Sequence, residues 1–151
     1  MKKFKFSLET VLDYKQQVLD SLRTEHGAIL AQLRAQEDVV HHLEEQYREL
    51  NADFCRRKME GMTICEALGF EQYLRMEEHR IEKETQRLHE IQQQEEAKRS
   101  EVVDAKLETS SIEKLREKKL DAYHKAIQKA EELQIEEFVS TTRAMAAGVK
   151  A

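Results

Sequence analysis

Residues 8–54 decide the fold, and they read LETVLDYKQQVLDSLRTEHGAILAQLRAQEDVVHHLEEQYRELNADF. Alternate steps of four and three along this stretch select fourteen positions, of which eleven are apolar or aromatic. They are Leu8, Leu12, Lys15, Leu19, Leu22, His26, Ile29, Leu33, Gln36, Val40, Leu43, Tyr47, Leu50 and Phe54. An average spacing of 3.5 residues is the pattern of a coiled-coil seam, which stays aligned only if a partner helix winds around it left-handedly. The stretch therefore predicts a long helix that needs a long partner.

The composition of the whole chain also favours long helices. The 151 residues include no proline, no tryptophan and only four glycines, and 36% of them are charged. Because proline is the strongest helix breaker, nothing of that kind interrupts the chain. High charge with few aromatic residues also fits a disordered protein. A disordered chain, however, has no reason to keep a regular apolar spacing, so we expect a folded helical protein.

Charge and hydropathy exclude several classes of function. The net charge of −5 gives no global basic field for nucleic acid. No apolar run approaches the roughly 20 residues needed to cross a bilayer, and the first nine residues, MKKFKFSLE, lack the apolar core of a secretory signal. We therefore expect a cytoplasmic protein without direct membrane insertion. Two cysteines, Cys55 and Cys65, are too few for a disulfide scaffold and are expected to be free.

The chain divides into two helical stretches and one turn. The first helix is expected at about 7–58, after a frayed lead-in at residues 2–7. The turn is expected at about 59–69, where two glycines and a β-branched pair cluster, and a short helical turn inside it is allowed. The second helix is expected at about 70–145, with a looser register near Ser110. This layout predicts an all-α fold, an antiparallel coiled-coil hairpin in a single domain of residues 1–151.

The expected pairing follows from the position of the turn. Folding the chain back at about residue 64 brings Phe54 level with Leu74 and Leu12 near Arg116. It also brings Gln36 level with the glutamines at 92–94, so that the polar breaks of the two helices meet. A polar layer in a seam lowers stability and helps fix the register.

The two helices differ in length, which predicts an overhang. At 1.5 Å per residue the first helix spans about 75 Å and the second about 110 Å. The second helix should therefore extend past the first from about Leu120 onward. An apolar stripe left without cover on a helix is a candidate binding surface. The stripe comprises Tyr123, Ile127, Ala130, Leu133, Ile135, Phe138 and Val139.

Sequence signatures of catalysis are absent. The chain contains no Gly-rich phosphate loop, no Cys-x-x-Cys, no His-Glu-x-x-His and no Gly-x-Ser-x-Gly. Its many carboxylates are expected to form a solvated face. His41, His42 and His89 fall near one another in the expected pairing, but a helical surface offers no second shell to hold a metal. We expect a protein that is not an enzyme and uses no cofactor or metal.

Three stretches resemble the family of the flagellar export protein FliJ. They are FKFSLETVLDYK at 4–15, FEQYL at 70–74, and IEKLREKKLDAY at 112–123 followed by Glu136-Glu137. The resemblance covers nearly the full chain in length and layout. The family often has Asp-Glu where this chain has Glu136-Glu137.

The resemblance implies both a fold and a role. Members of the family form a two-helix antiparallel coiled coil similar to the gamma-subunit stalk of rotary ATPases. They belong to the flagellar type III export apparatus and lie peripherally at the cytoplasmic face of the cell membrane. The implied partners are the export ATPase ring, the cytoplasmic domain of the membrane export gate, and export chaperones. The implied role is to couple ATPase and gate and so promote flagellar protein export, flagellar assembly, motility and chemotaxis.

One end of the hairpin is the expected ATPase-binding site. A basic run, Lys114, Arg116, Lys118, Lys119 and Lys125, would meet acidic loops of the ATPase, although a solvated helix face explains these residues equally simply. The proposed contact residues are Leu8, Leu12, Arg116, Lys119, Tyr123, Ile127, Leu133 and Phe138.

The half of the hairpin near the turn is the expected gate-binding site, because aromatic residues concentrate there. These positions resemble those by which the family binds the gate, and the competing interpretation is ordinary packing in the seam. They are Gln36, Val40, Leu43, Tyr47, Phe70, Tyr73 and Leu74.

Two alternatives of another class stay open. The chain could be a structural homodimeric coiled-coil spacer, or a general export chaperone without a stalk role. A spacer should self-associate through the overhang.

Overall fold

A computed structural model describes residues 3–148, and helices make up almost all of this range. Helix α1 runs over Glu9–Glu60 and helix α2 over Ile64–Gly148, and no strand occurs in residues 3–148. The predicted all-α fold with two long helices packed against each other is confirmed. The chain divides into two compact units, each containing part of both helices. The turn unit spans Val18–Asp104, and the terminal unit combines the described residues up to Gln17 with those from Ala105 onward.

The seam predicted on the first helix is present. All fourteen positions from Leu8 to Phe54 are buried or half-buried, while most residues between them are exposed. The most buried of them include Leu12, Leu19, Val40, Leu43 and Phe54. The 3.5-residue spacing therefore identified the face of α1 that packs against α2.

The matching seam on α2 is more regular than the apolar residues alone suggested. Buried or half-buried positions recur in steps of three and four from Ala67 to Arg116. Charged residues occupy five of these positions, Glu77, Glu84, Glu95, Lys98 and Arg116. The polar stretch around residues 92–101 is therefore part of the seam rather than a break in it. Long charged side chains can pack their stems against a partner helix while their polar ends reach hydrogen-bond partners.

The turn is shorter than expected. Only residues 61–63 separate the two helices, so the predicted turn at 59–69 was too long and α2 begins six residues before the expected start at 70. Gly61 ends α1 with a φ of 102°, a backbone conformation that glycine adopts without steric cost. Thr63 and Glu66 then cap α2 reciprocally. The Thr63 backbone N–H donates to Glu66 Oε2 (3.0 Å), and the Glu66 backbone N–H donates to Thr63 Oγ1 (3.2 Å).

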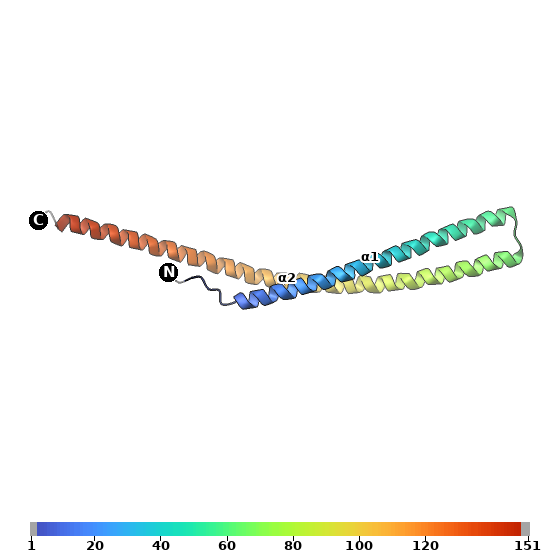
Figure 1. The fold of residues 1–151 in the computed structure, drawn as a ribbon, viewed down its shortest axis with the longest axis horizontal. Helices are drawn as coiled ribbons and strands as arrows, with labels where there is room; N and C mark the ends of the chain where they lie inside the picture. The colour runs from blue at the N-terminus through green and yellow to red at the C-terminus, as the bar shows by residue number, and fades with distance from the viewer. Residues whose placement is uncertain (1–2, 149–151) are drawn as a thin grey trace. The chain divides into compact units, whose positions relative to one another are not determined.

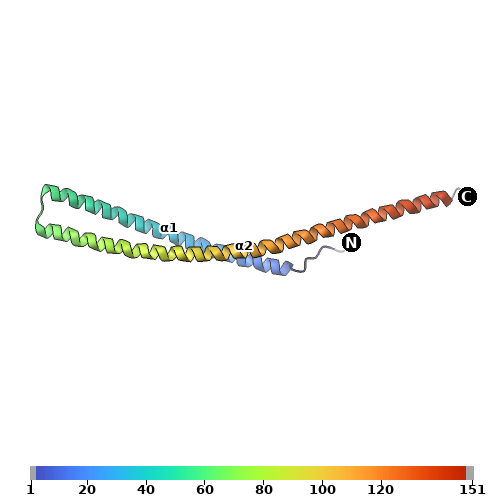
Figure 2. The same ribbon diagram turned by 180° about the vertical axis from the view of Figure 1, so that it is seen from behind.

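Within the turn unit the two helices lie side by side and antiparallel, as Figure 1 and the reverse view in Figure 2 show. The rings of Phe54 and Phe70 stack near the turn with their centroids 5.1 Å apart. Further along, Gln36 Nε2 donates to the backbone oxygen of Glu84 (3.0 Å) and to its carboxylate (2.6 Å). The expected pairings of Phe54 with Leu74 and of Gln36 with residues 92–94 are therefore wrong. A turn centred two residues earlier shifts every partner on α2 towards lower numbers.

A second polar layer of the turn unit involves His26. Its Nε2 lies 2.8 Å from Glu95 Oε1, and both side chains are largely buried. Beside it, Lys98 Nζ donates to Glu25 (2.9 Å) and to Glu101 (3.0 Å), and these carboxylates raise the pKa of Lys98. Gln36, His26 and Lys98 are thus paired across the two helices.

Candidate interaction surfaces

The N-terminal segment of the terminal unit packs on α2. Phe6 is 7% exposed and lies under Lys119, whose Nζ is 5.7 Å from the ring centroid. The Phe4 ring lies 5.5 Å from that of Tyr123. The prediction of a frayed lead-in was therefore wrong for residues 3–7, because Phe4 and Phe6 find apolar surface on α2 and cover Tyr123 in part.

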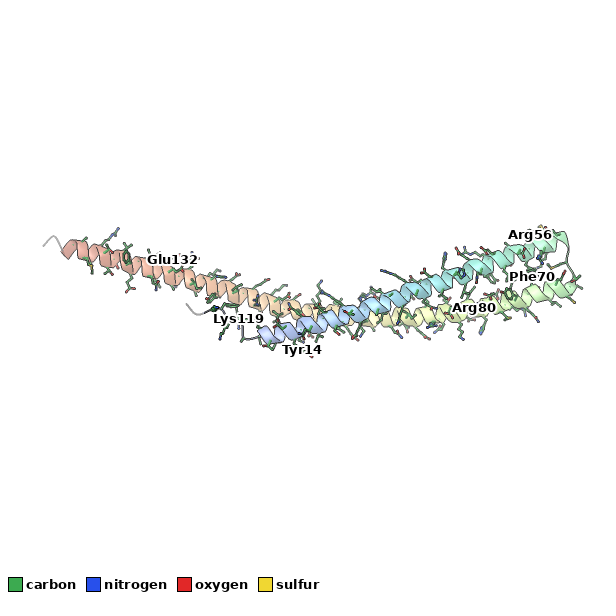
Figure 3. The ribbon with its side chains drawn as sticks, viewed as in Figure 1. Tyr14, Arg56, Phe70, Arg80, Lys119 and Glu132 are labelled. Carbon is green, nitrogen blue, oxygen red and sulfur yellow. The ribbon has the colours of Figure 1, made fainter. Side chains whose placement is uncertain are left out.

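This packing forms a shallow groove of about 800 Å³, which we call the lysine groove. Figure 3 shows Lys119 of α2 beside the N-terminal segment. Three lysines and no acidic residue line the groove, although the chain as a whole carries a net charge of −5. Its lining comprises Lys3, Phe4, Lys5, Lys119, Ala122 and Tyr123.

The eight residues predicted to bind the ATPase all belong to the terminal unit. Leu12 is buried, and Leu8 and Ile127 are half-buried, so these three contribute mainly to packing. Arg116 donates from Nε to Glu9 Oε2 at 3.0 Å, which ties the start of α1 to α2. The other lysines of the basic run, Lys114, Lys118 and Lys125, are exposed.

An ion pair and a hydrogen bond connect the first two turns of α1 to α2 within the terminal unit. Lys15 Nζ lies 2.6 Å from Glu108 Oε2, and this hydrogen bond raises the pKa of Lys15. Gln16 donates to Glu113 Oε1 at 3.2 Å. These contacts use acidic residues of α2 that face α1, so they leave the exposed lysines of the basic run available.

The predicted overhang begins later than expected, after Ile127. Tyr123 and Ile127 are half-buried, whereas every described residue from 128 to 148 is exposed. Leu133 is 57% exposed and Phe138 is 72% exposed, and both lie on this exposed segment of α2. In Figure 3 Glu132 marks the part of α2 that has no other helix beside it. We call residues 128–148 the exposed tail.

The seven residues predicted to bind the gate differ in how far they are exposed. Gln36, Val40, Leu43 and Leu74 are buried between the helices and act as packing residues in this structure. Tyr73, in contrast, is 50% exposed and lines a shallow groove of about 490 Å³ with Leu50 and Arg80. A partner can reach the groove beside Tyr73 without separating the two helices.

Tyr47 and Phe70 are intermediate. The Tyr47 hydroxyl donates to Glu78 Oε1, and this hydrogen bond raises the Tyr47 pKa. Phe70 stacks on Phe54 and has the Arg57 guanidinium 5.5 Å from its ring centroid. Figure 3 shows Phe70 on α2 close to the turn, with Arg56 on α1 near the same end. Both aromatic side chains are half-buried.

Sequence reasoning missed four exposed apolar residues near the turn. Three of them lie in the segment assigned to the turn, where only a short helical turn was expected, and the fourth lies early in the expected second helix. The Thr-x-x-Glu pattern at 63–66 is the signal that could have placed the start of α2 at Ile64. The residues are Met59, Ile64, Leu68 and Met76.

The histidines and cysteines form no combined site in the described chain. His41 lies 3.1 Å from Glu45, and His89 hydrogen-bonds Gln93 at 3.2 Å. Across residues 3–148 no cluster of three or more metal-ligating side chains occurs. Cys55 and Cys65 are free and exposed. Neither described helix has a stretch long and apolar enough to cross a membrane.

The fold and the exposed surfaces place this protein among the all-α helical hairpins. Its helices pack through a coiled-coil seam, and its longer helix exposes apolar residues at its end. Residues 4–146 match the family described as Flagellar FliJ protein, which is nearly the whole chain. The chain belongs to the FliJ family and is a component of the flagellar export apparatus. Members of this family are structural components of that apparatus, and the family is not a known enzyme family. No curated protein and no solved structure matches the chain.

Proposed function

We propose that this protein is a stalk that binds the export ATPase ring through its terminal unit and the cytoplasmic domain of the export gate through its turn unit. One observation carries the proposal most directly. The exposed tail presents Leu133, Phe138 and Met145 to solvent, and each is more than half exposed. Exposed apolar side chains gathered on one segment favour a protein partner, because burying them is worth about 25 cal/mol per Å².

The charge of the terminal unit supports a partner with acidic loops. Lys3, Lys5 and Lys119 line the groove, and the exposed Lys118 lies next to it on α2. Positive charge at the contact speeds association with an acidic partner and fixes its orientation more than it adds affinity. The apolar tail would supply the affinity and the lysines the orientation.

The turn unit supports a separate partner. Tyr73, Leu68 and Met76 are exposed on α2, and aromatic residues and methionine are enriched in the cores of protein interfaces. The buried Gln36, Val40, Leu43 and Leu74 would hold the helices that present this surface. Binding to the ATPase and to the gate would place the protein peripherally at the cytoplasmic face of the membrane.

A double substitution in the tail tests the ATPase contact. Leu133→Ala with Phe138→Ala removes two exposed side chains and leaves the seam untouched, so helicity by circular dichroism should not change. We expect stimulation of the purified export ATPase to fall by about tenfold or more, the size typical of interface anchors. Met59→Ala, at an exposed position of the turn unit, is the matched control. Undiminished stimulation by the double variant would refute the tail as the ATPase contact.

A further inference from the structure

The lysine groove and the exposed tail have complementary chemistry. The groove has three lysines around the apolar surface of Phe4 and Tyr123. The tail carries Glu131, Glu132, Glu136 and Glu137 among exposed apolar residues, and no basic residue occurs from 130 to 142. An acidic, apolar segment is therefore the kind of ligand that the groove fits.

One chain cannot bring its own tail into its own groove. Residues 119–123 and 131–139 lie on the same uninterrupted helix, α2. About twelve residues of helix hold them about 18 Å apart along the axis. The tail that fills a groove must come from another molecule.

We infer that a second copy of this chain covers the terminal unit, with the exposed tail of each copy in the lysine groove of the other. A two-fold axis near residue 128 makes both contacts at once, because in such an interface a residue pair is formed twice. The two α2 helices run antiparallel, so each tail gains a helical neighbour like the one that α1 provides up to about Arg116, where Glu9 begins α1. A parallel pairing would instead place the four glutamates of one tail against those of the other.

This inference deepens the proposed function and rests on it in one respect. The groove and the tail are also the surfaces offered to the ATPase. The dimer is therefore a resting form in which the ATPase-binding end is masked, and the ATPase must separate the two copies. Formation of the dimer does not require the ATPase and can be tested in its absence.

Charge reversal on the two sides of the contact tests the pairing. Lys5→Glu with Lys119→Glu reverses the groove, and Glu136→Lys with Glu137→Lys reverses the tail. We expect wild-type protein to sediment as a dimer that weakens as salt rises, because salt screens exposed charges. Each variant alone should dimerise at least about tenfold more weakly, since like charges then face each other. An equal mixture of the two variants should dimerise about as well as wild type.

Controls separate this contact from general effects of charge and folding. Lys106→Glu with Lys114→Glu makes the same change in net charge at exposed positions of α2 outside the groove and outside residues 117–139, and should leave the dimer intact. Lys119 also covers Phe6, so Lys5→Glu alone provides a groove variant that leaves this packing in place.

Three outcomes would overturn the inference. Wild type could sediment as a monomer at every concentration, which would mean that a second copy does not cover the lysine groove and the exposed tail. The tail variant alone could dimerise more strongly than wild type, which would indicate parallel tails. The mixture could fail to restore the dimer. A dimer that forms as described while the Leu133 and Phe138 variant still stimulates the ATPase would refute only the proposed function.

Discussion

Tyr47 and Tyr73 show how residues of one type can take different roles. Both lie in the turn unit and both are candidate gate contacts. Tyr47 is half-buried and its hydroxyl is engaged by Glu78, whereas half of the Tyr73 surface is open to solvent. The side chain that can be buried by a partner at little cost to the hairpin is therefore Tyr73.

Tyr73→Ala is expected to weaken binding to the purified cytoplasmic domain of the gate by about tenfold, because truncation of an aromatic anchor commonly costs more than 1 kcal/mol. Calorimetric titration measures the affinity, and thermal melting should show little change in stability. Tyr47→Phe keeps the ring and removes only the exposed hydrogen bond, so it serves as the control with near-normal affinity. Equal loss in both variants, or none in Tyr73→Ala, would contradict the assignment.

At the scale of the element, the start of α2 is held by two side chains. Thr63 and Glu66 satisfy backbone N–H groups that have no partner inside the helix. Hydrogen bonds from the backbone N–H and the hydroxyl of Thr63 hold the pKa of the Glu66 carboxyl below its usual range. A carboxylate with a lowered pKa in the folded state stabilises that state above the unfolded pKa, and this contribution is lost as pH falls through the folded pKa.

Thr63→Ala should lower the free energy of unfolding by about 1 kcal/mol, because the cap to the Glu66 N–H is lost. Urea unfolding followed by circular dichroism measures the change. In the same assay Glu66→Ala should be less stable than wild type near neutral pH, and the difference should shrink in acid. Glu66→Gln keeps a capping oxygen that does not titrate, so it separates the cap from the charge. A difference between wild type and Glu66→Ala that stays constant into acid would exclude the carboxylate as its source.

At the scale of the whole molecule, packing and binding use different residues. The seam holds α1 against α2 in each unit, and the exposed surfaces of the turn unit and the terminal unit add little to it. Polar seam residues such as Gln36 and His26 are satisfied by Glu84 and Glu95 across the hairpin. That residues 1–151 form one domain stays a prediction.

Two leucine truncations distinguish these roles. Leu43 is 4% exposed, so Leu43→Ala should lower the free energy of unfolding by about 2–4 kcal/mol through lost burial and a residual cavity. Leu133→Ala, in the exposed tail, should change it by less than about 0.5 kcal/mol. Chemical denaturation of both variants measures the contrast. Similar losses would mean that the tail is packed in the free protein.

The surfaces could be located from the sequence only in part. The exposed apolar residues Leu133 and Phe138 were identified because they lie on the second helix beyond the level at which the first helix begins. The contribution of Phe4 and Phe6 was missed, because a short segment without regular structure carries no periodic signal. Gln36 and Leu43 were assigned to binding because a seam pattern does not separate residues that pack within a chain from those that bind a partner.

The pairing of two long helices through a seam follows from the amino-acid sequence alone, because a 3.5-residue apolar spacing over residues 8–54 is stable only against another helix. The sequence did not determine which residues pair. The spacing repeats identically in every heptad, so a shift of the partner helix leaves the pattern unchanged. The register is fixed in the folded hairpin, because one alignment of the two helices satisfies the three-residue turn at 61–63 together with the contacts of Gln36 with Glu84 and of His26 with Glu95.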